Sequence, residues 1–150
     1  MPTNRPTLLM AATLAALLTV ACAGTDSTDT GITVTPGTWS YSVTEEIPLP
    51  GGRCSAKSSG TATVSAGGAY SITFPALSCS SCTMSASTSG TITTSAISGS
   101  VSASIAGSGC SSQQPTPRPA SVAGDCHTTT CTAQTASGDS FAVSYTLTPS

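Results

Sequence analysis

The chain is poor in charged and in aromatic side chains. Of its 150 residues, 7% are charged and 4% are aromatic, and the formal net charge is −2. The cations are Arg5, Arg53, Lys57 and Arg118. Nucleic-acid binding needs clustered cations that displace counterions from phosphates, so the sequence predicts no nucleic-acid partner. A basic patch for a membrane surface is excluded for the same reason.

A long apolar run is also missing. The longest, Leu8 to Val20, has 13 residues, whereas a helix that spans a bilayer needs about 20. A run of this length is typical of the apolar region of an export signal, and Arg5 supplies the charge that precedes it. We therefore interpret residues 1–22 as a signal segment that takes no part in the fold.

The signal segment ends in Leu18-Thr19-Val20-Ala21-Cys22-Ala23, which resembles the lipobox of bacterial lipoprotein precursors. In that family small residues precede a Cys that is acylated and becomes the N-terminus. Ala21 and Cys22 match the last two lipobox positions, whereas Thr19 stands where the family usually has Leu. The resemblance implies lipidation at Cys22 and attachment to a membrane through that lipid. Ala21-Cys22-Ala23 also fits the pattern cut by ordinary signal peptidase, so simple secretion is the alternative.

The segment after Cys22 is small, polar and slightly acidic. Residues 23–36 (AGTDSTDTGITVTP) can bury little surface, so we expect a flexible tether there and a single domain over residues 37–150. In Gram-negative lipoproteins a residue other than Asp after the acylated Cys usually directs the protein to the outer membrane. Ala23 therefore implies a lipoprotein of the cell envelope, at the outer membrane or cell surface.

Large apolar side chains are too few for an ordinary core. Residues 37–150 contain 15 Leu, Ile, Val and Phe, whereas the whole chain has 27 Ser and 27 Thr. Six cysteines remain after Cys22, and an even set in an exported chain predicts three disulfides that make up for the thin core. The cysteines expected in disulfides are Cys54, Cys79, Cys82, Cys110, Cys126 and Cys131.

The disulfide pairing cannot be deduced from the spacing of the cysteines. We favour Cys110 with Cys126, because that bond would fix the Pro-rich segment between them. Pro115, Pro117 and Pro119 cannot donate to a sheet, so we expect this segment to be a loop.

The body of the chain alternates apolar and hydroxyl residues, and it lacks the 3.6-residue period of a helix. The alternation is clearest over residues 39–44, 70–74, 101–105 and 141–147, and it predicts strands with one apolar face. A weak repeat predicts three hairpins with turns at Gly67-Gly68, Ser98-Gly99 and Ser137-Gly138-Asp139. The predicted fold class is all-β: an antiparallel meander, sandwich or barrel of about seven or eight strands.

Cys79-Ser80-Ser81-Cys82 is a CxxC sequence, which also occurs in redox and zinc sites. No cation stands near it to stabilise a thiolate, and the second CxxC of a zinc ribbon is missing. We interpret these cysteines as structural, and we expect no metal and no cofactor.

Two further groups invite a catalytic interpretation. His127 is the only His, and Asp125 is two residues away, but no Gly-x-Ser-x-Gly nucleophile elbow is present. Glu45 and Glu46 are adjacent, and neighbours in a strand point to opposite faces, so we interpret them as a solvated strand end rather than an acid/base pair. We therefore predict that the protein is not an enzyme, with a hydrolase that uses His127 as an alternative.

Gly37-Thr38-Trp39 resembles the Gly-x-Trp near the first strand of lipocalins and avidin-like barrels. That resemblance implies a carrier of a small hydrophobic or vitamin ligand, with a cavity of about 300 Å³ or more lined by Trp39, Tyr70 or Phe141. If the chain is not such a barrel, we expect Trp39 to be a core residue on the first strand. The sequence thus favours an exported, non-catalytic binding or structural module. A small-ligand carrier is the alternative, and the ligand and protein partner are unknown.

Overall fold

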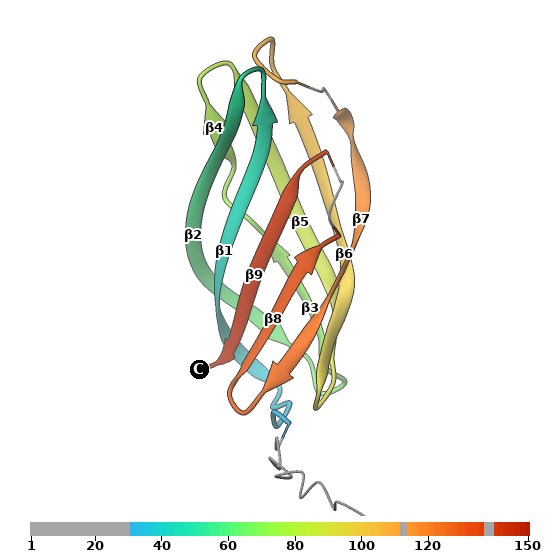
Figure 1. Ribbon diagram of the computed structural model, residues 1–150. Helices are drawn as coiled ribbons and strands as arrows, with labels where there is room; N and C mark the ends of the chain where they lie inside the picture. The colour runs from blue at the N-terminus through green and yellow to red at the C-terminus, as the bar shows by residue number, and fades with distance from the viewer. Residues whose placement is uncertain (1–30, 112–113, 137–139) are drawn as a thin grey trace, which may run out of the picture.

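The computed structural model describes residues 31–111, 114–136 and 140–150, and of residues 114–117 it describes the backbone alone. Within these ranges the chain forms strands, and no helix there could cross a membrane. The strands are β1 (Gly37–Leu49), β2 (Gly52–Val64), β3 (Ala69–Thr73), β4 (Leu77–Cys79), β5 (Cys82–Ile92), β6 (Ala96–Ala106), β7 (Gln114–His127), β8 (Thr130–Thr135) and β9 (Ala142–Pro149), as Figure 1 shows.

Eight of the strands close into an antiparallel barrel. The order around the sheet is β3-β2-β1-β9-β8-β7-β6-β5, and β3 pairs with β5 to complete the circle. Strands that follow one another in the sequence are thus neighbours in the wall, and the first and last strands also pair, from Trp39 with Pro149 to Glu46 with Ala142. The short β4 lies beside the other end of β5. The predicted all-β class and antiparallel pairing are confirmed, and the eight strands of the barrel match the predicted number, with β4 as one extra strand.

Alternation of side chains along each strand fills the barrel interior. In β1, Trp39, Tyr41, Val43, Glu45 and Ile47 point inward and are at most 8% exposed, while the residues that alternate with them point outward. Hydroxyl residues cover the outside, which is why so few large apolar residues are enough for this fold. The largest interior side chains that are almost fully buried are Trp39, Ile47, Met84, Ile97, Ile105, Tyr145 and Leu147.

Tyr70, Tyr145, Thr88 and Trp39 have hydrogen-bond partners for their buried polar groups. The Tyr70 and Tyr145 hydroxyls lie 2.5 Å apart, and the Thr88 hydroxyl lies 3.2 Å from that of Tyr145. Thr88 also donates to the Ser100 carbonyl at 3.1 Å. Trp39 is a core residue, as expected, and its Nε1 donates to the Thr35 carbonyl at 2.9 Å. These bonds satisfy groups that burial would otherwise leave without water.

The folded part begins before the predicted boundary at residue 37. Ile32 is 2% exposed and belongs to the core, and Val34 packs against that core. A single apolar side chain in a polar segment can still pack against the end of a barrel. The average composition of residues 23–36 does not indicate such a contact. The rest of the predicted tether, residues 23–30, lies outside the described residues, as does the signal segment with Cys22.

One predicted turn is confirmed and one is wrong. The β2–β3 turn contains Gly68, whose φ of 78° favours glycine. The β5–β6 turn lies at residues 93–95, whereas Gly99 is inside β6 and pairs directly with Gly90. The two glycines occur there because a Cβ on either would meet backbone of the opposite strand. The third predicted turn, residues 137–139, lies outside the described residues.

The Pro-rich segment is a strand rather than the predicted loop. β7 pairs with β6 from Gln114 to Asp125, with an irregular register between Gln114 and Arg118. The amide of Cys126 donates toward β6, to the Ser95 carbonyl. Donors alternate between the two edges of a strand, so Pro119 has its missing donor on the opposite edge, where β8 no longer pairs.

The three disulfides are present, but the favoured pair Cys110–Cys126 is wrong. The bonds join Cys54 to Cys79, Cys82 to Cys110, and Cys126 to Cys131. Cys126 and Cys131 face each other across the β7–β8 hairpin with their Cα atoms 4.0 Å apart. Because Cys126 is bonded to this neighbour, it cannot also bond to Cys110.

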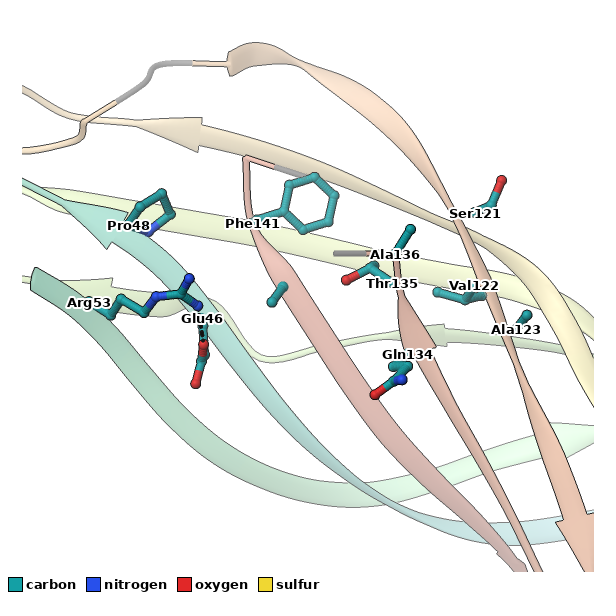
Figure 2. Close-up of a pocket in the computed structure, with 11 residues that line it drawn as sticks. Glu46, Pro48, Arg53, Ser121, Val122, Ala123, Gln134, Thr135, Ala136 and Phe141 are labelled. Atoms are coloured by element: carbon teal, nitrogen blue, oxygen red, sulfur yellow. Dashed lines mark hydrogen bonds and ion pairs between the residues drawn. The ribbon is translucent and has the colours of Figure 1, made fainter. Parts of the chain in front are cut away.

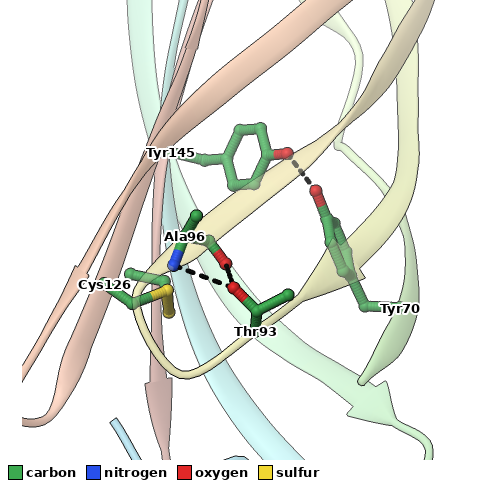
Figure 3. The surroundings of a disulfide bond; sticks show 6 residues. Tyr70, Thr93, Ala96, Cys126 and Tyr145 are labelled. Atoms are coloured by element: carbon green, nitrogen blue, oxygen red, sulfur yellow. Dashed lines mark hydrogen bonds between the residues drawn. A yellow bond between two sulfur atoms is a disulfide. The ribbon is translucent and has the colours of Figure 1, made fainter. Parts of the chain in front are cut away.

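Each bond ties a different part of the barrel. Cys54–Cys79 joins β2 to β4, and Cys82–Cys110 joins the start of β5 to the segment after β6. Near Cys126 the β5–β6 turn is closed by Thr93, whose hydroxyl contacts the amide and the carbonyl of Ala96 at 3.1 Å (Figure 3). The CxxC cysteines Cys79 and Cys82 therefore bond to separate partners and are structural, as expected.

Candidate functional site

The main cleft of the described structure lies where β8 ends. β8 pairs with β7 only as far as Thr135 with Val122, and with β9 only as far as Gln134 with Ser144. Beyond these pairs the wall has a cleft with a volume of about 660 Å³. Its lining comes from five strands and their ends: Glu46, Pro48, Arg53, Ser121, Val122, Ala123, Gln134, Thr135, Ala136, Phe141 and Ala142.

Several of the side chains that line this cleft are small. Ala123, Ala136 and Ala142 occupy positions where larger residues would fill it. Figure 2 shows Ser121 and Ala123 on the β7 side of the cleft and Pro48 on the β1 side. A smaller hollow of about 200 Å³ shares several lining residues with the cleft, among them Glu46 and Gln134, and extends it over the outer face of β9.

Both polar and apolar groups line the cleft. Arg53 Nη1 lies 2.9 Å from Glu46 Oε2 at its edge, with side-chain exposures of 71% and 35% (Figure 2). Such an exposed ion pair adds little stability, so both groups are available to a ligand at low cost. Phe141 is 4% exposed and forms the apolar part. Thr135 lines the cleft while its hydroxyl accepts the Val143 amide at 3.2 Å.

The residues expected to line a carrier cavity are separated by the fold. Trp39 and Tyr70 are 1% and 4% exposed in the barrel interior, where other side chains surround them. Phe141 lies at the side cleft instead. Of the described residues, those that line the two clefts belong to the wall of the barrel.

The candidate hydrolase residues lie away from the cleft. His127 and Asp125 are exposed and occupy alternate positions near the β7–β8 turn, where they pair in register with Thr130 and Thr132. Neither lines the cleft. A hydrolase that uses His127 would therefore need a surface site at the tip of this hairpin.

Glu45 departs most from the sequence prediction. It lies on the opposite face of β1 from Glu46, as expected, but it is 2% exposed rather than solvated. Its Oε1 is buried with no hydrogen-bond partner, and burial raises the pKa of this carboxyl to about 7. The apolar positions on either side, Val43 and Ile47, were the signal for an inward-facing residue at this position.

Metal binding has no support in the described part of the chain, where no three His, Cys, Asp or Glu side chains cluster in a way that could hold an ion. The six cysteines after Cys22 are all in disulfides. Comparison of the chain with family models, with curated proteins and with solved structures gave no match.

Proposed function

We propose that the protein is an exported, non-catalytic binding module, held at the cell envelope through a lipid on Cys22, that takes a small ligand into the cleft between β7, β8 and β9. Three disulfides are consistent with an extracellular or envelope location, because such bonds persist in oxidising compartments.

The side cleft is the single observation that carries the proposal. A volume of about 660 Å³ falls within the range of roughly 300–1,000 Å³ that is usual for small-molecule sites. The cleft combines an apolar side chain, Phe141, with a guanidinium, a carboxylate and the Gln134 amide. This combination suits a small molecule with an apolar body and one polar or anionic end, which Arg53 would receive.

The cleft is tested with a panel of small amphipathic carboxylates and isotope-labelled protein. We expect the amide resonances that shift in NMR spectra to cluster at the lining residues, and Ala123→Trp to abolish the shifts by filling the cleft. Ser85→Trp, on an exposed position of β5, is the matched control. Shifts that are scattered over the surface, or that persist in the Ala123 variant, would refute a ligand site there.

The lipid anchor is tested separately by Cys22→Ala in a Gram-negative expression host. We expect the wild type to partition with membranes and to incorporate labelled palmitate, and the variant to do neither. Thr19→Leu restores the usual lipobox residue and is expected to increase the lipidated fraction. If the Cys22 variant and the wild type have the same distribution, export proceeds by ordinary signal cleavage.

A further inference from the structure

The barrel interior contains two polar atoms without a partner, and they lie on neighbouring strands. Among the described side chains, the buried unpartnered atoms are Glu45 Oε1 and Ser58 Oγ. In the β1–β2 register Glu45 is opposite Ala56 and Val43 is opposite Ser58, so Glu45 and Ser58 are diagonal neighbours on the inner face. Buried polar groups almost always have partners, and two such atoms at diagonal positions of paired strands point to a bound group that donates hydrogen bonds to both.

Part of β2 around Ser58 has no strand partner on the side away from β1. β2 pairs with β3 only at Thr63 and Val64, and at its other end β2 is held to β4 by the Cys54–Cys79 bond. Between these two connections, over residues 55–62, β2 has no strand partner on this side. Ser58 lies in the middle of this interval.

The surroundings of the pair favour an organic cation over a metal ion. The next inward position on β2 is Gly60, and the Tyr41 ring packs so closely over it that a Cβ there would lie 2.8 Å from the ring hydroxyl. Tyr41 in turn contacts Phe74 edge-on, with ring centroids 5.8 Å apart. One carboxylate, one hydroxyl and an aromatic ring suit an ammonium group, whereas calcium needs about six to eight oxygen ligands.

We propose that Glu45 and Ser58 form an interior site for a small primary ammonium ion, which enters between β2 and the β3–β4 segment. The ammonium donates to Glu45 Oε1 and Ser58 Oγ, and its charge compensates that of the buried carboxylate. The inward-facing neighbours on the paired strands, Ala56 on β2 and Val143 on β9, are uncharged, so no side chain at these positions supplies that compensation. The site is on the inner face of β1, and it does not depend on the side cleft.

The chain provides a matched internal control, because Glu45 and Glu46 are its only glutamates. Protein labelled with ¹³C at glutamate therefore gives two side-chain carboxyl resonances. We expect methylammonium chloride to lower the midpoint of the Glu45 titration and to leave that of Glu46 unchanged. Sodium chloride at equal ionic strength is expected to have no selective effect on Glu45.

Variants assign the effect to the pair. Ser58→Ala is expected to weaken the methylammonium response about tenfold, as for loss of one hydrogen bond to a charged group. Ser59→Ala, on the exposed neighbouring position, is expected to leave it unchanged. In Glu45→Gln the methylammonium-dependent rise in melting temperature should vanish, while Glu46→Gln should retain it. An unshifted Glu45 titration, an equal response to sodium, or retention of the effect in Glu45→Gln would overturn the proposal.

Discussion

Glu45 and Glu46 are consecutive in β1, yet they lie on opposite sides of the barrel wall. Glu46 is paired with Arg53 at 2.9 Å on the outside, whereas Glu45 is 2% exposed on the inside, with an unpartnered Oε1. The two carboxyls differ only in which face of the strand they occupy. Burial on the inner face makes ionisation of the Glu45 carboxyl unfavourable. The barrel nevertheless has a carboxyl at this interior position, although its large apolar residues are few.

The stability of the protein is expected to fall as the pH rises from about 5 to 7. The pKa of Glu45 is raised from 4.5 to about 7 in the folded state, so folding favours the protonated form. That contribution is complete below the unfolded pKa and is lost as the pH rises through the folded pKa; it amounts to at most about 3 kcal/mol. Urea denaturation of the metal- and amine-free protein at pH 5 and pH 8 measures it.

Glu45→Gln removes the titrating group and is expected to remove most of this pH dependence. Glu46→Gln, on the outer face, is expected to preserve it. A wild-type curve that is flat between pH 5 and 8 would mean that the Glu45 carboxyl is solvated or already compensated in the folded protein.

The disulfides are expected to contribute unequally. Cys54–Cys79 closes a separation of 25 residues and Cys126–Cys131 one of 5. Chain entropy then predicts that removing the first pair costs about 3–4 kcal/mol and removing the second about 2 kcal/mol. Urea denaturation of the two Cys→Ala double variants tests the order. Equal losses would contradict an entropic origin and would indicate local packing instead.

Gly60 should tolerate substitution less well than Gly52. A Cβ on Gly60 would meet the Tyr41 ring at 2.8–2.9 Å, whereas one on Gly52 would meet nothing within 4 Å. We expect Gly60→Ala to lower the free energy of unfolding by about 1–3 kcal/mol, as for overpacking, and Gly52→Ala to change it by less than about 0.5 kcal/mol. Similar losses in both would show that the Tyr41 ring moves aside without cost.

Pro119 is expected to protect the free edge of β7. Its missing donor lies on the edge that β8 leaves unpaired, and exposed edges with free donors promote strand-to-strand association. Pro119→Ser adds a donor without adding apolar surface, so we expect dimers or larger species in size-exclusion chromatography. Ser102→Ala, on the residue that pairs with Pro119 in β6, is the control. A Pro119→Ser protein that stays monomeric at high concentration would argue that the edge is protected in another way.

The alternation of residues such as Trp39, Tyr41 and Val43 made the all-β fold predictable, because a period of two has a single structural meaning. The pairing of Cys126 with Cys131 was not predictable before the β7–β8 turn was placed. Pro119 led to the wrong prediction of a loop. A proline excludes a strand only where a partner strand lies on the edge that lacks the proline's N–H donor. No motif in the sequence indicates the cleft, because the cleft forms at the point where β8 ends between its two neighbouring strands.

The most direct test of the account is the intact mass of the protein purified from membranes, denatured and treated with iodoacetamide before and after reduction. We predict a chain that begins at Cys22, carries acyl groups, and takes up the reagent on six cysteines only after reduction. A chain that retains its first 21 residues, lacks acyl groups, or is alkylated without prior reduction would contradict an envelope-anchored barrel held by three disulfides.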